Sequence, residues 1–213
     1  MTRLLLIRHG ESEANRNNIF AGQIDPDLQD KGLEQAKATA KFINETYEVD
    51  KIYSSDLKRA YNTARALADI LNIEIIKEKG MREIAAGEWE GILFSDLVKL
   101  FPDDFNKWMT SIGEARCTGG ETVKELAERV VATLTKIAEE SDGKTVAVAT
   151  HATPIRVALA VIKTGSVDGA NEVGWVSNAS VTELTYENGK FKVEAEGQDE
   201  HLKALVTKLP DNV

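Results

Sequence analysis

Short apolar runs and longer amphipathic stretches alternate along the chain. Within a strand expected at 3–7, Leu4 to Ile7 is an unbroken apolar run, which is typical of a strand buried on both faces. From Ser55, the expected N-cap, to about Leu71 the apolar residues instead recur at helical spacing. The same analysis predicts further strands at 51–54, 73–76 and 145–149, and further helices at 33–47, 95–109, 122–140 and after a start at Thr153-Pro154.

The last part of the chain carries a different pattern. Segments 181–186 and 191–196 flank Asn188-Gly189, which favours the tight turn of a β-hairpin. Alternating strands and helices predict parallel strands with helices on both faces, whereas a hairpin adds an antiparallel pair. The fold class we expect is therefore α/β: a three-layer α/β/α sandwich whose central sheet is mainly parallel with an antiparallel element.

Composition is that of an ordinary soluble globular protein. The 213 residues are 42% apolar and 29% charged, with no low-complexity linker, so we expect a single domain over 1–213. The net charge of −9 argues against a nucleic-acid partner, because neutralising a phosphate backbone needs clustered Lys and Arg. A small anionic metabolite is still compatible with this charge, since it responds to the local field of a pocket.

The chain also lacks signals for export or membrane insertion. Cys117 is the single cysteine, so no internal disulfide can form. No apolar run approaches the roughly 20 residues of a membrane span. The apolar part of the N-terminal segment is too short, and too soon followed by charge, for a signal peptide. We therefore expect a cytoplasmic location and no membrane partner.

Two of the three histidines directly follow expected core strands. His9 comes after the strand at 3–7, and His151 comes after the strand at 145–149. Ligands of open α/β sheets bind outside the carboxyl ends of the strands, so both imidazoles could face one pocket. A single buried histidine is more often structural than functional, but two such placements in one chain favour a shared site.

Polar neighbours of these histidines suggest a phosphate ligand. Arg8 precedes His9, and a guanidinium is a planar, bidentate donor to phosphate. Gly10 lets the backbone turn sharply and approach a ligand closely. Asn15 fits equally well as a neutral donor or as a helix or turn cap. Taken alone, Arg59 would be interpreted as a solvated surface residue. It lies near the start of a helix, however, and the preceding strand brings that helix start to the same edge of the sheet as the histidines.

Other chemistries have no fingerprint in this sequence. GxGxxG and GxxxxGK[ST] are both absent, which leaves dinucleotide and Walker-type binding unsupported. No short-spaced set of His, Cys and carboxylates indicates a metal site. Cys117 has no catalytic phosphate-loop pattern around it. We therefore expect neither a metal nor a cofactor.

Five ordered motifs resemble those of the histidine phosphatase superfamily, also called the phosphoglycerate mutase-like family. They span about residues 4–156, and together they are far more specific than one Arg-His-Gly run. The motifs are Leu5-Leu6-Ile7-Arg8-His9-Gly10-Glu11-Ser12 with Asn15; Tyr53-Ser54-Ser55-Asp56-Leu57-Lys58-Arg59-Ala60 with Thr63-Ala64; Arg82-Glu83-Ile84 with Gly87 and Trp89-Glu90-Gly91; Gly119-Gly120-Glu121-Thr122; and Thr150-His151-Ala152 with Ile155-Arg156.

The resemblance implies a role for each matching residue. His9 would be the nucleophile that is transiently phosphorylated, and Glu83 the general acid and then the base that activates water. The phosphoryl oxygens would be held by the remaining matched groups, which are Arg8, Asn15, Arg59, His151 and Ala152. Two departures from the family pattern bear on substrate preference: Ala152 stands where glycine is frequent, and Asp27 stands where proline is frequent.

Three functions are compatible with these motifs. The chain is too compact for the extra segments of the cofactor-dependent glycolytic mutases, so we expect a phosphatase for a small phosphorylated metabolite. The alternatives are phosphoglycerate mutase-type transfer and, less favoured because the matched residues are all present, a non-catalytic phosphate-binding protein. Relatives are often dimers, which leaves a homodimer open.

Residues 92–118 are the segment that we expect to influence specificity. Their aromatic and thioether side chains would either cap the active site or pack this segment onto the domain; they are Phe94, Phe101, Phe105, Trp108 and Met109.

Overall fold

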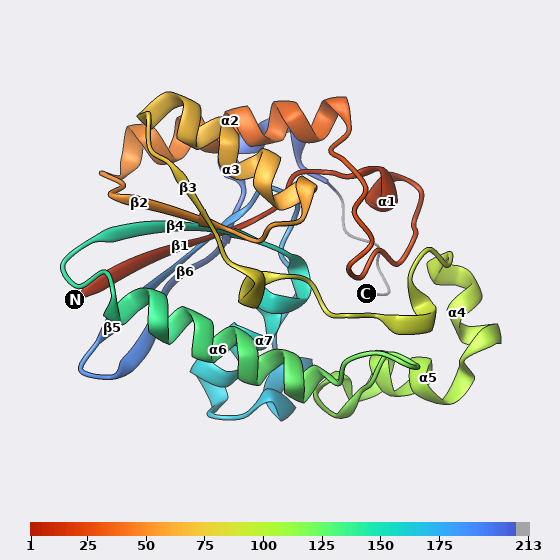
Figure 1. Ribbon diagram of the computed structural model, residues 1–213. Coiled ribbons are helices and arrows are strands. Elements are labelled where there is room, and N and C mark those ends of the chain that lie inside the picture. Colours follow the sequence, from red (N-terminus) through yellow and green to blue (C-terminus); the bar gives the residue numbers. More distant parts are fainter. Residues whose placement is uncertain (208–213) are drawn as a thin grey trace.

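A computed structural model describes residues 1–207 of the chain (Figure 1). Its centre is a six-stranded sheet with the order β3-β2-β4-β1-β5-β6. β1 pairs with β4 in parallel and with β5 in the antiparallel sense, so the predicted mixed sheet is confirmed. The strands are β1 (Thr2–Arg8), β2 (Lys51–Ser54), β3 (Ile75–Lys77), β4 (Thr145–Thr150), β5 (Val181–Glu187) and β6 (Lys190–Gln198).

Helices cover both faces of this sheet, which confirms the three-layer architecture (Figure 1). Alternate residues of β1 explain the layers. Leu5 and Ile7 belong to a core cluster with residues of α2 and α3, whereas Leu4 and Leu6 pack on the other face with residues of α6 and α7. The helices are α1 (Glu13–Arg16), α2 (Asp30–Thr46), α3 (Lys58–Leu71), α4 (Phe94–Leu100), α5 (Pro102–Thr110), α6 (Val123–Glu139) and α7 (Ala152–Thr164).

The register of the central strands determines where the histidines lie. Arg8 is paired with Thr150, so β1 and β4 end side by side. His9 extends this pairing by donating its backbone N–H to the Thr150 carbonyl at 3.0 Å. His9 and His151 therefore leave the sheet at the same edge, as the sequence predicted.

The predicted hairpin is also present. β5 and β6 are antiparallel neighbours joined at Asn188 and Gly189, whose φ angles are 51° and 76°. Positive φ at both central residues is the requirement of a type I′ turn, which Asn-Gly meets at low cost.

Three predictions of local structure were wrong. The helix expected at 95–109 is interrupted at Phe101, because Pro102 starts α5 as its first helical residue. Ser55 is not the N-cap of α3; Leu57 takes that position without a side-chain hydrogen bond. Thr153-Pro154 does not open α7 either, since His151 is its N-cap and Ala152 its first residue.

Smaller differences concern element ends. The predicted strand at 73–76 is observed at Ile75–Lys77, and the helix predicted from residue 33 begins at Asp30. The short helix α1 was not predicted. Among residues 1–207, no helix has both the length and the apolar character that crossing a bilayer requires.

Candidate active site

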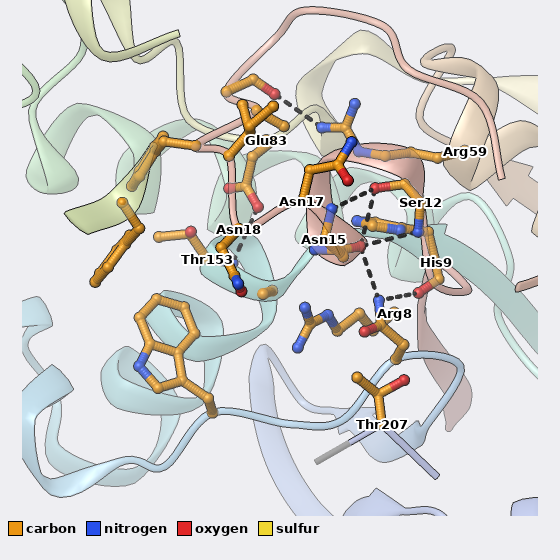
Figure 2. A pocket seen from close by; sticks show the side chains of 18 of the residues that line it. Arg8, His9, Ser12, Asn15, Asn17, Asn18, Arg59, Glu83, Thr153 and Thr207 are labelled. Carbon is orange, nitrogen blue, oxygen red and sulfur yellow. Dashed lines mark hydrogen bonds between the residues drawn. The ribbon is translucent and has the colours of Figure 1, made fainter. Parts of the chain in front are cut away.

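A cavity of about 600 Å³ opens at the carboxyl ends of β1 and β4. The sequence motifs that were singled out supply much of its polar lining, although they are far apart in the chain. Figure 2 shows these side chains converging on one space. The predicted site residues in the lining are Arg8, His9, Asn15, Arg59, Glu83 and Ala152.

His9 is held in one tautomer by its own loop. Its Nδ1 lies 2.7 Å from the carbonyl oxygen of Gly10, so Nδ1–H donates and Nε2 keeps a free lone pair. The ring is buried, and burial, followed by the charges of Arg59 and Arg8, holds the pKa of His9 well below 6.5. A neutral imidazole with a free Nε2 is a nucleophile at physiological pH.

Gly10 has a different use from the one that was expected. A Cβ at this position would lie 2.5 Å from the carbonyl oxygen of Gly32, at the start of α2. Gly10 also donates its backbone N–H to the Thr63 hydroxyl of α3 at 3.0 Å. The glycine thus lets the loop after β1 pack tightly against the two helices of one face.

His151 lies edge-on to His9, with the ring centroids 5.1 Å apart. Its Nε2 is 2.8 Å from the hydroxyl oxygen of Ser55, which explains why Ser55 does not cap α3. Within residues 1–207 its buried Nδ1 has no hydrogen-bond partner. Burial, followed by the charge of Arg59, lowers the pKa of His151 well below 6.5. The ring is therefore neutral, and an incoming anion would favour its protonation.

Two guanidinium groups are fixed beside the histidines. Arg8 donates to the carbonyl oxygen of Val176, and burial lowers the pKa of Arg8 to about 10, so it is still cationic at neutral pH. Arg59 is only 1% exposed, which excludes the alternative of a solvated surface residue. It donates to the carbonyl oxygens of Ile24 at 2.9 Å and Gly22 at 2.8 Å. Both cations are thus held in place before any ligand binds.

Glu83 lines the same cavity as these cations and is 9% exposed. One carboxylate oxygen accepts from the backbone N–H of Ile84 at 2.8 Å, and the other accepts from Thr153 at 3.4 Å. The second contact joins Glu83 to the first turn of α7, directly after His151. Glu83 therefore lines the same cavity as His9, whereas the fully buried His151 is not among the described lining residues.

Arg129 of α6 holds the Glu83 loop and was missed by the sequence analysis. Its guanidinium donates to the carbonyl oxygens of Gly80, Arg82 and Glu83 at 2.8 to 2.9 Å. The same group pairs with Glu121 at 2.7 Å. Glu121 belongs to one of the recognised motifs, but nothing in the local pattern distinguishes Arg129 from the other charged residues of α6.

Asn15 has the capping role that was one of its two interpretations, and its role as a donor to phosphate stays a prediction. Its Oδ1 accepts from the backbone N–H of Ser12 at 3.1 Å and completes the capping box of α1. The side chain also lines the cavity. Asn178, which the sequence did not single out, donates to the His9 carbonyl at 3.0 Å and to Asn15 Oδ1 at 3.3 Å. The loop before β5 thus holds the backbone of His9 in place.

Side chains of the segment 92–118 contribute to two different environments. Leu93, Phe94 and Trp108 line the cavity. Phe101 and Phe105 instead pack against Trp89 within the core, with ring centroids at 6.2 and 5.9 Å. Figure 1 shows α4 and α5 together at one end of the molecule. Met109, which was expected with them, is exposed and is not among the lining residues of the cavity.

The remaining candidates for reactive chemistry do not form a second site in the described chain. Burial, followed by nearby carboxylates, raises the pKa of the Cys117 thiol, which keeps it protonated. No group of three or more His, Cys, Asp and Glu side chains within residues 1–207 is arranged to hold a metal ion.

The fold and the site define a class of protein. A neutral imidazole beside two buried guanidinium groups, with a carboxyl group nearby, can provide a nucleophile, charge stabilisation and a proton donor for phosphoryl transfer. The family model described as "Histidine phosphatase superfamily (branch 1)" matches residues 4–199. The chain belongs to this superfamily, and the resemblance inferred from its motifs is confirmed.

Similar proteins agree on the reaction. Phosphoserine phosphatase 1 of Hydrogenobacter thermophilus is 37% identical over 156 residues, which cover 73% of this chain and 74% of that protein. A metal-independent phosphoserine phosphatase of Arabidopsis thaliana is 30% identical over 207 residues, covering 96% and 85%. A phosphoserine phosphatase mutant of Entamoeba histolytica, solved with phosphoserine, has a TM-score of 0.84 at 25% identity, covering 95% and 100%. The family and these relatives make the chain a phosphatase of small phosphate monoesters that acts through a histidine.

Proposed function

We propose that this phosphatase works in two steps through a phosphohistidine on His9. In the first step the Nε2 lone pair attacks phosphorus, the bond from phosphorus to the alcohol oxygen breaks, and Glu83 gives that oxygen its proton. In the second step the Glu83 carboxylate takes a proton from water, the water oxygen attacks phosphorus, and the P–N bond breaks to release phosphate. The observation that carries the proposal is the free, neutral Nε2 of His9 beside Arg8 and Arg59.

The other site residues would stabilise the transferring group. Arg8 and Arg59 provide permanent positive charge for the equatorial oxygens, and His151 adds a donor when the anion favours its protonation. Asn15 provides a neutral amide, and Ala152 provides a backbone N–H at the start of α7. These cationic groups supply the charge that a metal supplies in other phosphatases, so we propose a metal-independent reaction with no cofactor.

We further propose that 1–213 is one domain in which residues 92–118 act as a cap. The lining positions of Leu93, Phe94 and Trp108 support this role. Specificity for the alcohol part of the substrate would then depend on α4 and α5, while the phosphate end is bound by the loops after β1 and β4.

The proposed setting is the cytoplasm, and the proposed assembly is a homodimer. The single, buried Cys117 thiol suits a reducing compartment. Exposed apolar side chains at Ile70 of α3 and Ile76 of β3 support self-association. Light scattering on a size-exclusion column should give twice the chain mass, and Ile76→Lys should shift it toward the monomer; a wild-type monomer would contradict the dimer.

Phosphate release in the presence of EDTA tests the function. The panel would include O-phospho-L-serine, suggested by the relatives' names, and 3-phosphoglycerate with and without 2,3-bisphosphoglycerate. Release should persist in EDTA and disappear in His9→Ala. Loss in EDTA that a divalent ion restores would contradict metal independence, and isomer exchange without net release would favour a mutase. Retained binding of phosphate without turnover of any ester would favour the non-catalytic alternative.

A further inference from the structure

The cavity is much larger than a phosphate group requires, and its lining combines polar with apolar side chains. Pockets of about 300–1,000 Å³ accommodate whole small molecules, and this one has about 600 Å³. Figure 2 labels its polar side chains, among them Arg8, His9 and Glu83. The lining also includes apolar side chains, which are Ile19, Phe20, Leu93, Phe94, Trp108 and Trp175.

These aromatic side chains form one packed wall. Phe20 contacts Trp108 edge to face at 5.3 Å and stacks on Phe94 at 6.4 Å. Trp108 in turn stacks on Trp175 at 6.3 Å. The guanidinium of Arg156 lies 4.3 Å from the Trp175 ring and donates through Nε to the Ala170 carbonyl, which fixes that ring. The wall is therefore preorganised, and burying an apolar group against it would cost little ordering entropy.

Charged groups for the alcohol part of a substrate are scarce among the described lining residues. Arg8 and Arg59 are the cations of that lining, and both already belong to the phosphate end. Glu83 is its carboxylate, and it is needed for proton transfer. The nearby Arg82 and Arg129 are paired with Asp56 and Glu121.

An amino-acid ester fits this lining poorly. O-phosphoserine carries a carboxylate as well as an ammonium on its alcohol part, and the carboxylate would lose water against aromatic ring faces without a matching cation. An uncharged apolar alcohol would instead gain about 25 cal/mol for each Å² removed from water. The exposed neutral amides of Asn17 and Asn18, which also line the cavity, suit an occasional hydroxyl or carbonyl group.

We propose that the preferred substrates are phosphate monoesters of uncharged alcohols with an aromatic or similarly bulky apolar group, rather than phosphorylated amino acids. The proposal rests on the proposed phosphatase function and adds the chemistry of the leaving alcohol. Trp175 and Phe94 are the specificity-determining side chains in this proposal, because they line the cavity and are only partly buried.

The test compares benzyl phosphate with O-phospho-L-serine, phosphocholine and ethyl phosphate, which are all alkyl esters, so leaving-group reactivity differs little. Benzyl phosphate should have a kcat/KM at least about tenfold higher than the others, as burial of one ring predicts. A preference for phosphoserine or phosphocholine would overturn the proposal while leaving the phosphatase function intact. If the protein hydrolysed none of the four, the proposed function itself would fail.

Single substitutions test the contribution of the aromatic wall separately from that of the rest of the site. Trp175→Ala should lower kcat/KM for benzyl phosphate about tenfold and leave ethyl phosphate nearly unchanged. Leu93→Lys should raise kcat/KM for phosphoserine relative to that for benzyl phosphate, because it adds a cation at an exposed lining position. Val98→Ala, exposed on α4 and outside the lining, is the matched control and should behave as wild type. Equal losses on benzyl and ethyl phosphate in Trp175→Ala, with phosphoserine unimproved in Leu93→Lys, would contradict the assignment.

Discussion

At the residue scale, the properties of His9 depend on its immediate neighbours. The Gly10 carbonyl fixes the proton on Nδ1, and burial together with Arg8 and Arg59 disfavours a second proton on the ring. The proposed nucleophile is therefore a neutral imidazole before substrate binds. The chemistry of this position follows from residues adjacent in sequence, with the exception of Arg59.

The protonation of the histidines gives a direct prediction. Burial is the largest cause of the lowered pKa of His9, His151 and His201 alike. All three rings should therefore stay neutral at pH values somewhat below the ordinary histidine pKa of about 6.5. Ring ¹⁵N shifts followed from about pH 7.5 to about pH 6 should show neutral imidazoles throughout for His9 and His151. A titration midpoint near the ordinary value for His9 would contradict the buried, cation-flanked geometry.

The rate lost on removing the Glu83 carboxyl group should depend on how strongly basic the leaving group is. In Glu83→Gln, hydrolysis of an alkyl ester such as ethyl phosphate should fall by about 10²-fold or more, because the leaving alkoxide is strongly basic. Release of nitrophenolate from 4-nitrophenyl phosphate in the first turnover should fall much less, since that leaving group needs little protonation. Stopped-flow absorbance measures this first turnover. Equal losses on both esters would contradict the role of general acid.

The sequence identified the site residues that follow strands, but not the residues that hold those site residues in place. His9 and His151 were predictable because a strand delivers each one to a known edge of the sheet. The burial of Arg59 was not, since it depends on carbonyl groups of residues 22 and 24. Asn178 supports His9 from a loop far away in sequence, and no local pattern marks such a contact.

At the scale of elements, α6 positions the loop that carries Glu83. Arg129 donates to three carbonyl groups of that loop and is itself oriented by Glu121. Removing the guanidinium would leave these acceptors without their donor, at a cost of about 1–3 kcal/mol in unfolding free energy. It would also free the Glu83 carboxyl group to move.

Arg129→Met tests this positioning role. The variant should lose activity on ethyl phosphate more than on 4-nitrophenyl phosphate, which is the leaving-group dependence expected of Glu83→Gln. A purely structural defect would lower both rates together and would contradict the role. Arg65→Met, which removes an exposed guanidinium from α3, is the matched control and should keep the wild-type rates and melting temperature.

The pattern of apolar residues predicted most elements because their periodicity is local. It failed at the ends of elements, where one or two side chains determine the residue at which a helix begins or ends. Pro102 divided the helix expected at 95–109, and the hydroxyl of Ser55 lies against His151 rather than capping α3. The second error falls at the site itself, where the Ser55 side chain contacts His151 instead of the local backbone.

At the scale of the whole molecule, the sheet order brings the motifs together. β1 and β4 are neighbours although more than a hundred residues separate them in sequence, and their loops meet those from β2 and the Glu83 segment at one cavity. Alternation of strands and helices predicted this edge, but the strand order and the aromatic wall depend on long-range packing that no single segment specifies.

The covalent intermediate is the central claim, and Glu83→Gln should make it accumulate. With 4-nitrophenyl phosphate the first step needs little acid, whereas water attack still lacks its base. Alkaline quenching preserves phosphohistidine, and peptide mass spectrometry locates it. The account predicts one phosphoryl group on His9, formed at the rate of the nitrophenolate burst. The group should be absent from the double variant that carries both Glu83→Gln and His9→Ala. A phosphoryl group on another residue, or turnover without any phosphoenzyme or burst, would contradict the account.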